Sequence, residues 1–380
     1  MRINDFYAIG FRNLKEISVS PSPQVNVIYG ENGQGKTNLL EALWLFTGTK
    51  SFRSQGLGVR ERDFINFDEK VATLQMFFTT AERQQNAKLV YPKDNIRSKK
   101  AWLNGVELGN TSKLFGSFRS VIFCPEHLSL VKGGPDGRRS FLDGAVSQIR
   151  KGYMRTLWQY NKILAQRNAL LKEISYKREL SSTLEMWDFQ LAKAGTYITI
   201  QRLDYVNKLS KACREYYEGI SQGREMLDIS YCSTIFTGVQ EPISYTEGIV
   251  NHYFNKLQSS VKDDIKQGYT SYGIHRDDIA CCLDKRPAKS FGSQGQQRSI
   301  VLSLKLSEAE LLREEFLDNP VILFDDVLSE LDSSRQSFIM NNLGDMQVFI
   351  TCCDPNSTQQ LKQGAIFEVV NGKVLQTKSG

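Results

Sequence analysis

Two short motifs in this chain carry residues whose types and spacing suit chemistry on a nucleoside triphosphate. Residues 30–37 read Gly-Glu-Asn-Gly-Gln-Gly-Lys-Thr, which fits the phosphate-binding pattern G-x-x-x-x-G-K-[ST]. Glycines let backbone N–H groups approach phosphates, and the N-terminus of a following helix attracts negative charge. We predict that Lys36 contacts the β- and γ-phosphates of ATP and that Thr37 binds Mg²⁺. The predicted cradle comprises Gly30, Glu31, Asn32, Gly33, Gln34 and Gly35.

The second motif is an apolar run that ends in two carboxylates. Residues 321–324 read Val-Ile-Leu-Phe, and Asp325 and Asp326 follow them. A continuous apolar run is typical of a buried parallel strand. We predict that Asp325 binds Mg²⁺ and that Asp326 orients or activates the attacking water. Lys36 and Asp326 are therefore the predicted catalytic residues.

A third motif lies shortly before the acidic strand. Residues 293–298 read Ser-Gln-Gly-Gln-Gln-Arg, and residues 298–315 have the apolar spacing and charges of a helix. A helix N-terminus at this turn would be a second anion site. Because the chain has one P-loop but two such anion sites, we predict a head-to-tail homodimer. In it, Ser293 and Gly295 of one chain would close on the γ-phosphate held by the other.

The elements that must position these motifs fall into two groups. Residues 25–29 and 120–124 favour strands, residues 38–46 favour a helix, and Asn104-Gly105 fits the type I′ turn of a hairpin over 102–108. Beyond Pro135, apolar residues recur at helical spacing, which indicates a packed helical arm whose aromatic residues belong to its core. The three apolar stripes are Val146, Ile149, Tyr153, Leu157, Tyr160, Leu164 and Leu171; Leu184, Trp187, Leu191, Ala194, Ile198, Tyr205 and Leu209; and Ile249, Tyr253, Leu257 and Val261.

The predicted fold class is therefore α/β, with a P-loop nucleotide domain that a helical arm interrupts. Residues 1–135 and 263–380 would form the nucleotide domain, and residues 136–262 the inserted arm. A chain of 380 residues is long enough for two such domains.

Positive charge is concentrated in one segment of the chain. The net charge is +6, but residues 138–178 hold ten Lys or Arg against two acidic residues, so the rest of the chain nets −2. A local basic field is typical of a surface that binds nucleic-acid phosphates. The predicted DNA-binding residues are Arg138, Arg139, Arg150, Lys151 and Arg155. Two alternatives are a solvated helix face without a partner, and a DNA site on the strand-rich lobe near Arg97, Lys99 and Lys100.

Composition excludes several other classes of protein. The sequence contains no run of 18 apolar residues, so no segment is expected to span a membrane. The first residues lack the pattern of a secretion signal. Seven cysteines without framework spacing indicate free thiols in a reducing cytoplasm. The absence of a C-x-x-C pair, with only three histidines, argues against a zinc site.

Taken together, these motifs resemble the ABC-type ATPase heads of the SMC group and, within it, the RecF family of bacterial DNA replication and repair proteins. The resemblance runs the length of the chain. The stretches that carry it are residues 10–14 (Gly-Phe-Arg-Asn-Leu), the P-loop, Pro125-Glu126, Lys132-Gly133, Pro135 with Arg138-Arg139, residues 141–143 (Phe-Leu-Asp), residues 275–278 (His-Arg-Asp-Asp), the Ser-Gln-Gly-Gln signature and residues 324–332.

The resemblance implies a function and further site residues. It implies that Arg12, Asn13 and Gln296 join the nucleotide site and that the chain dimerises on ATP. It also implies binding to single-stranded, gapped and double-stranded DNA, slow DNA-dependent ATP hydrolysis, and help to RecR and RecO in loading RecA. The sequence departs from the wider pattern of ABC ATPases at residues 349–354 (Phe-Ile-Thr-Cys-Cys-Asp), because many of these proteins carry a switch histidine there. It also lacks a glutamine in the usual γ-phosphate-sensing loop, where the nearest candidate is the turn at 124–126.

Two other functions remain compatible with the ATP motifs alone. One is the nucleotide-binding subunit of a membrane transporter, which the missing switch histidine and the long helical insertion disfavour. The other is a structural clamp that binds ATP without hydrolysing it.

Overall fold

The computed structural model describes residues 1–53, 61–94, 99–109, 111–328, 331–354 and 364–378. The chain forms two compact units: unit 1 comprises Met1–Leu128 and Val301–Gly380, and unit 2 comprises Ser129–Ile300. The sequence prediction placed these boundaries at 135/136 and 262/263. Unit 2 extends beyond 262 because β10 (Asp278–Leu283) pairs along its whole length with β9 (Leu227–Cys232), which lies inside the predicted arm.

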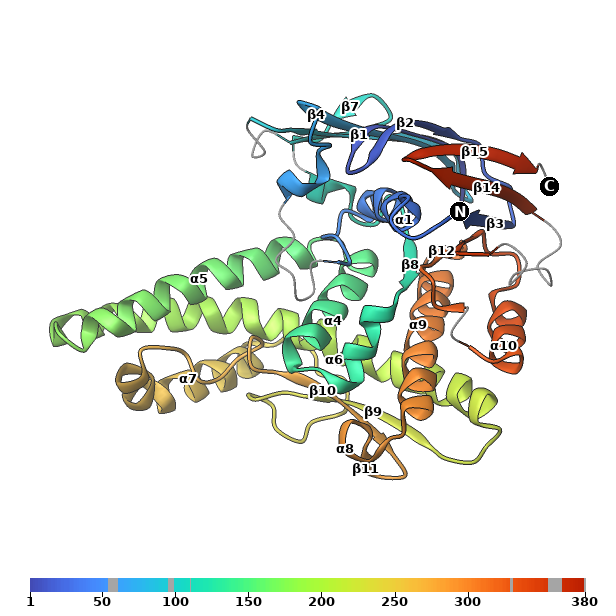
Figure 1. Ribbon diagram of the computed structural model, residues 1–380. Helices are drawn as coiled ribbons and strands as arrows, with labels where there is room; N and C mark the ends of the chain where they lie inside the picture. Colours follow the sequence, from blue (N-terminus) through green and yellow to red (C-terminus); the bar gives the residue numbers. More distant parts are fainter. Residues whose placement is uncertain (54–60, 95–98, 110, 329–330, 355–363, 379–380) are drawn as a thin grey trace. The chain divides into compact units, whose positions relative to one another are not determined.

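The first layer of unit 1 is an antiparallel sheet (Figure 1). Its strand order is β2-β1-β4-β5-β6-β7. Burial in β4 alternates along the strand, as expected for a sheet with one face on a core. The predicted hairpin is confirmed, because Asn104 and Gly105 join β6 to β7 with the positive φ angles of 51° and 80°. The strands are β1 (Arg2–Phe11), β2 (Leu14–Val19), β4 (Val71–Thr79), β5 (Gln84–Pro92), β6 (Lys100–Leu103) and β7 (Val106–Glu107).

The second layer of unit 1 is a mostly parallel sheet with the order β15-β14-β3-β13-β12-β8. Every residue of β8, β12 and β13 is buried, which confirms the predicted buried strand at 321–324. Its strands are β3 (Val25–Tyr29), β8 (Ser120–Phe123), β12 (Val321–Phe324), β13 (Val348–Cys352), β14 (Gly364–Val370) and β15 (Lys373–Lys378).

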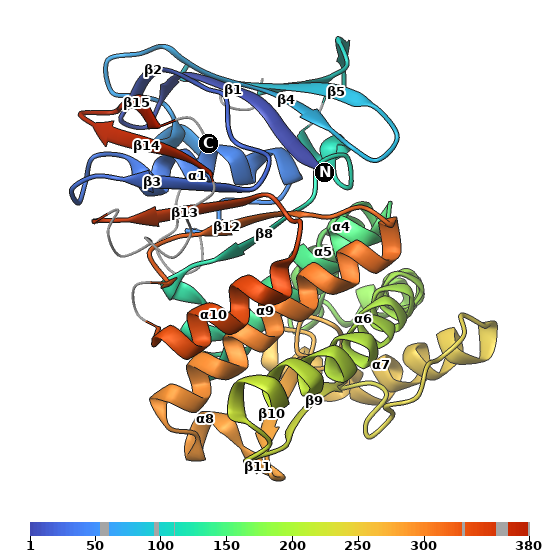
Figure 2. The ribbon, with the colours of Figure 1, turned by 90° about the vertical axis from the view of Figure 1, so that its right-hand side faces the viewer.

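Helix α1 (Lys36–Trp44) lies between these two sheets (Figure 2). Its Leu39, Leu40 and Leu43 join residues from both sheets in one hydrophobic core. A single 3-10 turn, Leu45–Thr47, continues the helix to Gly48, where a left-handed φ of 81° ends it. Unit 1 also contains α10 (Ser333–Leu343), which Asp332 caps by accepting a hydrogen bond from the Arg335 N–H.

Unit 2 is built on three long helices, α5 (Tyr153–Ile174), α6 (Leu184–Ser221) and α7 (Glu247–Gln267), with α5 and α7 both packed on α6. The predicted core role of the stripe aromatics is confirmed for Tyr153, Tyr160, Tyr205 and Tyr253, which are at most 4% exposed. Trp187 differs, because it is only partly buried. The unit also contains α3 (Ser129–Lys132), α4 (Pro135–Ile149), a 3-10 helix (Arg178–Thr183), α8 (Ala288–Phe291), the strands β9, β10 and β11 (Arg286–Pro287), and the start of α9 (Gln294–Phe316).

A buried ion-pair cluster fastens the three long helices together. Arg167 of α5 is fully buried and pairs with Asp188 of α6 and, at 2.8 Å, with Asp264 of α7. Close approach of α6 to α7 requires a glycine at 195, since a Cβ there would lie 2.5 Å from the Tyr253 ring. Among the helices of the described ranges, none has both the length and the apolar character needed to cross a membrane.

Candidate nucleotide-binding site

The P-loop connects the end of β3 to the start of α1, as the sequence predicts. Gly30, Gly33 and Gly35 have φ angles of 152°, 82° and 121°, which side chains other than hydrogen rarely allow. A Cβ at Gly30 would lie 2.4 Å from the carbonyl oxygen of Val369. The backbone path of this loop therefore depends on its glycines.

Lys36 lies across the loop with its ammonium group among backbone oxygens. The side chain is buried, and Nζ donates to the carbonyl oxygens of Gly30 at 2.7 Å and Glu31 at 3.2 Å. These two carbonyl oxygens hold the ammonium group against the backbone of the loop. Glu31, Asn32 and Gly33 are exposed and Gln34 is partly exposed, so the loop surface is accessible.

Asn13 and Arg12 support the loop from the turn between β1 and β2. The Asn13 amide donates to the carbonyl oxygens of Gly33 at 3.2 Å and Gln34 at 2.9 Å. Arg12 forms a bidentate ion pair with Glu41, a buried residue of α1. One of its two hydrogen bonds, from Nη2 to Oε1, measures 2.8 Å. Both residues thus fix the position of the P-loop and its helix, and Arg12 does so through a carboxylate that the sequence reasoning did not single out.

The acidic pair lies beside the P-loop, because β12 and β3 both pair with β13 in the parallel sheet. Asp325 Oδ1 accepts a hydrogen bond of 2.8 Å from the Thr37 hydroxyl. Burial raises the pKa of Asp325 from 3.8 to about 6, although hydrogen bonds from Thr37 and Thr351 oppose the shift. The structure therefore brings together the two residues predicted to bind Mg²⁺.

Thr351 is a site residue that the sequence analysis did not identify. Its hydroxyl donates to Asp325 Oδ1 at 3.0 Å and accepts from the Asp326 backbone N–H at 2.9 Å. Asp326 has a φ of 53°, a left-handed conformation that is uncommon for a residue other than glycine. No local sequence pattern marks this residue; the parallel register pairs Phe324 with Ile350 and so places the residue after Ile350 next to the acidic pair.

Cys353 directly follows β13, within the stretch 349–354 that lacks the switch histidine of many ABC ATPases. Its Sγ lies 3.7 Å from Lys36 Nζ and 3.3 Å from Asn32 Oδ1. A thiol, rather than an imidazole, therefore borders the P-loop at this position.

The Ser-Gln-Gly-Gln signature begins α9, which confirms the prediction of a turn at a helix N-terminus. Ser293 and Gln296 cap each other: the Gln296 N–H donates to Ser293 Oγ at 3.2 Å, and the Ser293 N–H donates to Gln296 Oε1 at 2.6 Å. Ser293 is exposed, and Gly295 and Gln296 are partly exposed. The signature lies in unit 2 and the P-loop in unit 1.

The five predicted DNA-binding residues divide into two groups. Arg138 pairs with Asp278 through bonds of 2.6 and 2.7 Å and also donates to two backbone carbonyls, while Arg139 donates to the Asp277 carbonyl at 2.8 Å. These two guanidinium groups join α4 to the segment that enters β10. Lys151 and Arg155 are exposed, and the partly exposed Arg150 lies 3.4 Å from Asp204.

The alternative DNA site on the strand-rich lobe consists of three residues, of which the structure describes Lys99 and Lys100. Lys99 pairs with Glu61, and Lys100 lies 3.2 Å from Glu107. Arg97 lies outside the described residues.

The combination of a P-loop, a buried acidic strand end and a Ser-x-Gly-Gln helix start on this fold defines the head of an SMC-like ABC-type ATPase. The Smc head domain of Pyrococcus furiosus, solved with the C-terminal domain of ScpA, shares the fold: it has a TM-score of 0.55 and 16% identity over 99% of this chain and 96% of that chain. The family model described as RecF/RecN/SMC N terminal domain matches residues 2–374.

Closer relatives narrow the class to one family. The DNA replication and repair protein RecF of Clostridioides difficile is 36% identical over the full length of both chains, and that of Desulforamulus reducens is 39% identical over 99% of each. A solved structure of the recombination mediator protein RecF-ATP in the RecFOR pathway has a TM-score of 0.89 and 35% identity, covering 99% of this chain and 98% of that chain. The chain belongs to the RecF family, as the sequence motifs predicted.

Proposed function

We propose that this protein is an ATP-gated DNA-binding protein of recombinational repair and replication. The observation that carries the proposal is the 2.8 Å hydrogen bond from Thr37 to Asp325, because it joins the P-loop to the acidic strand end. Family membership supports the same function, since relatives that align over the full chain bear the name DNA replication and repair protein. Neither observation favours a transporter subunit.

The donor set at the strand end suits Mg²⁺. A threonine hydroxyl and a carboxylate are oxygen ligands of the kind this ion prefers. Thr37, in α1, and Asp325, directly after β12, bring one of each together. With a pKa of about 6, Asp325 is mostly ionised at neutral pH and can meet a cation. Bound Mg²⁺ would neutralise charge on the β- and γ-phosphates of ATP, which residues 30–35 cradle and Lys36 orients.

Asp326 is the residue we assign to the attacking water. Its backbone is held by Thr351, which also contacts Asp325, so the two carboxylates keep a fixed mutual position. A single short carboxylate in this role suits slow hydrolysis that times the release of DNA. Phosphate release measured with and without DNA separates a slow, DNA-dependent ATPase from a clamp that does not hydrolyse ATP.

We assign the ATP-dependent dimer contact to the start of α9. Exposed Ser293, with Gly295 and Gln296, would present the helix N-terminus to the γ-phosphate bound by the other chain. Sizing the protein by light scattering with ADP, ATP and a gapped DNA tests the nucleotide, the dimer and the DNA together. We expect ATP to give a dimer in the parent and a monomer that still binds ATP in Ser293→Arg. A normal dimer in that variant would exclude the head-to-tail arrangement.

We propose that DNA is held through its backbone by Arg150, Lys151 and Arg155, without sequence readout. Arg138 and Arg139 support that surface from within, since their guanidinium groups are engaged by Asp278 and by the Asp277 carbonyl. RecR- and RecO-type mediators are the proposed protein partners in placing RecA, because the solved relatives are described in the RecFOR pathway. Such a role would place the protein in the cytoplasm, where chromosomal DNA is found.

A further inference from the structure

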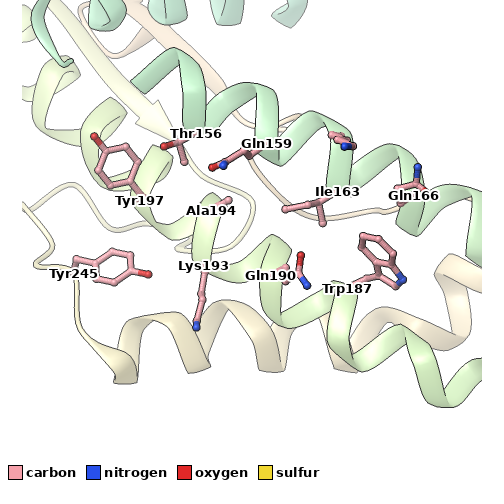
Figure 3. Close-up of a pocket in the computed structure, with 11 residues that line it drawn as sticks. Thr156, Gln159, Ile163, Gln166, Trp187, Gln190, Lys193, Ala194, Tyr197 and Tyr245 are labelled. Carbon is pink, nitrogen blue, oxygen red and sulfur yellow. The ribbon is translucent and has the colours of Figure 1, made fainter. Parts of the chain in front are cut away.

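A groove of about 740 Å³ runs between α5 and α6 within unit 2 (Figure 3). Each helix contributes one stripe of residues to it, with successive spacings of three, four and three positions, so each stripe lies on one helix face. The stripe on α5 is Thr156, Gln159, Ile163 and Gln166, and the stripe on α6 is Trp187, Gln190, Ala194 and Tyr197. Tyr245, from the segment just before α7, also lines the groove.

The lining is neither a typical core nor a typical solvated surface. Its three aromatic side chains, Trp187, Tyr197 and Tyr245, are all incompletely buried, and Tyr245 is 52% exposed. They lie among three glutamines, whose amides both donate and accept hydrogen bonds. Flat aromatic faces beside amides are well suited to stack on rings that carry polar edges.

The charge of the groove is positive. Lys162 and Lys193 belong to the lining and are exposed, whereas none of the lining residues that the structure describes is a carboxylate. Asp188, which follows Trp187 directly, is fully buried and faces Arg167 in the ion-pair cluster. The groove therefore complements a ligand that carries negative charge.

We propose that this groove is a subsite for unpaired nucleotides of a single-stranded nucleic acid. Trp187, Tyr197 and Tyr245 would stack on bases, while Lys162 and Lys193 would contact the phosphates. Along α6, Trp187 and Tyr197 are separated by about 15 Å, which corresponds to about four nucleotides at the 3.4 Å spacing of one stacked strand. Bases within a duplex already stack on one another, so the groove distinguishes unpaired from paired DNA. The proposal rests on the proposed DNA-binding function and gives it a site for the single-stranded part of a gap.

The test compares the parent with Trp187→Ala, using the full chain with ATP and without nucleotide. The probes are a fluorescent twelve-residue oligothymidylate, an abasic strand of the same length, and a duplex. Stacking contributes about 1–3 kcal/mol per base, so Trp187→Ala should weaken oligothymidylate binding between about 5-fold and 150-fold. Binding of the abasic strand and the duplex should be unchanged. Tyr245→Ala, at a half-exposed loop position, should act in the same direction without risk to the helix packing.

The matched control is Trp158→Ala, which removes an exposed tryptophan of α5 that is not part of the groove lining. It should bind all three probes like the parent. In Lys162→Ala/Lys193→Ala, the slope of log affinity against log salt for the single strand should fall by about 1.4, at about 0.7 for each phosphate contact.

Two results would overturn the groove proposal. One is parent-like oligothymidylate binding in both Trp187→Ala and Tyr245→Ala. The other has two parts: polyglutamate displaces the oligothymidylate from the parent but not from Trp187→Ala, and Trp187→Ala still prefers the oligothymidylate over the abasic strand as strongly as the parent does. That result would assign the groove to an acidic protein segment. A parent that forms no ATP-dependent dimer and binds no duplex would instead count against the proposed function, while the difference between parent and variants on the single strand would still decide the groove.

Discussion

The buried carboxylate of Asp325 should destabilise the nucleotide-free protein, so removing its charge should stabilise the fold. Burial raises its pKa from 3.8 to about 6. At 1.36 kcal/mol per pKa unit, that shift corresponds to about 3 kcal/mol at neutral pH. Asp325→Asn keeps an oxygen to accept from Thr37 and Thr351 but adds an amide donor, which costs about 1 kcal/mol if it lacks a partner. We therefore expect a net stabilisation of about 2 kcal/mol.

The pH dependence has a defined sign. A carboxyl group whose pKa is raised by folding binds its proton more tightly in the native state, so the free energy of unfolding falls as pH rises from 3.8 through about 6. Above this window the parent carries the full cost of the buried charge. Below it, Asp325 is protonated in both native and unfolded protein, and the variant should lose its advantage.

The assay is urea unfolding of parent and Asp325→Asn, followed by circular dichroism at pH 7.5 and pH 4, first without nucleotide. The variant should be the more stable protein at pH 7.5 and should lose most of that advantage at pH 4. With Mg²⁺ and ATP the order should reverse at pH 7.5, since ligands that bind the native state stabilise the parent more. The matched control is Asp326→Asn, at a less buried position whose left-handed φ asparagine tolerates well. It removes only the repulsion that the Asp326 charge adds to the raised pKa of Asp325, so its stabilisation should be much smaller. A variant no more stable than the parent at pH 7.5, or one equally stabilised at both pH values, would refute the reasoning.

The remaining predictions concern binding, hydrolysis and DNA. Lys36→Ala should weaken ATP binding about 10-fold or more, because the phosphates lose a charge-assisted partner; titration with a fluorescent ATP analogue measures this. Asp326→Asn should bind ATP and dimerise but release phosphate about 100-fold more slowly, which would leave the DNA complex long-lived. Thr351→Val should also slow phosphate release but weaken ATP binding much less than Lys36→Ala does, because it removes the hydrogen bonds to Asp325 and Asp326 without touching the P-loop. Replacing Arg150, Lys151 and Arg155 together by Ala should lower the slope of log affinity against log salt for duplex DNA by about 2 to 3.

For each of these variants, one result would contradict the role that we assign to the residue. Parent-like ATP affinity in Lys36→Ala would remove the P-loop assignment, and equal phosphate release from parent and Asp326→Asn would show that another group handles the water. Loss of ATP binding in Thr351→Val would mean that the residue supports the whole loop rather than the acidic pair. An unchanged salt slope in the triple variant, with a reduced slope in Lys99→Ala/Lys100→Ala, would move the DNA site to the strand-rich lobe.

The local parts of this fold could be predicted from the sequence because each rests on short-range chemistry. The P-loop path needs glycines at positive φ, the hairpin needs Asn104-Gly105, and a buried parallel strand needs an uninterrupted apolar run such as 321–324. Pairing between β9 and β10 could not be predicted in this way, since it joins segments on either side of α7. That pairing is what carries unit 2 past the predicted boundary at 262.

Side-chain partners were the other limit, because a sequence gives the number of charges but not their counter-charges. Arg12 belongs to a motif that the sequence analysis quoted, yet its partner Glu41 became visible only when α1 was placed against the turn after β1. Thr351 is inconspicuous in the run Phe-Ile-Thr-Cys-Cys, and only the register of β12 against β13 brings it to the acidic pair.

The same limit affects the interpretation of the basic segment. The ten cations of residues 138–178 do not form one surface. Arg138 pairs with Asp278, and Arg167 is fully buried between Asp188 and Asp264. A buried guanidinium held by carboxylates cannot also meet a phosphate, because moving it would leave those carboxylates uncompensated inside the protein. Of these ten cations, we therefore expect the exposed ones on and near α5 to meet a phosphate, including Lys151, Arg155 and Lys162. Lys162 also lines the groove beside Trp187, so cations available for a DNA backbone and aromatic faces available for unpaired bases occur on the same helix pair.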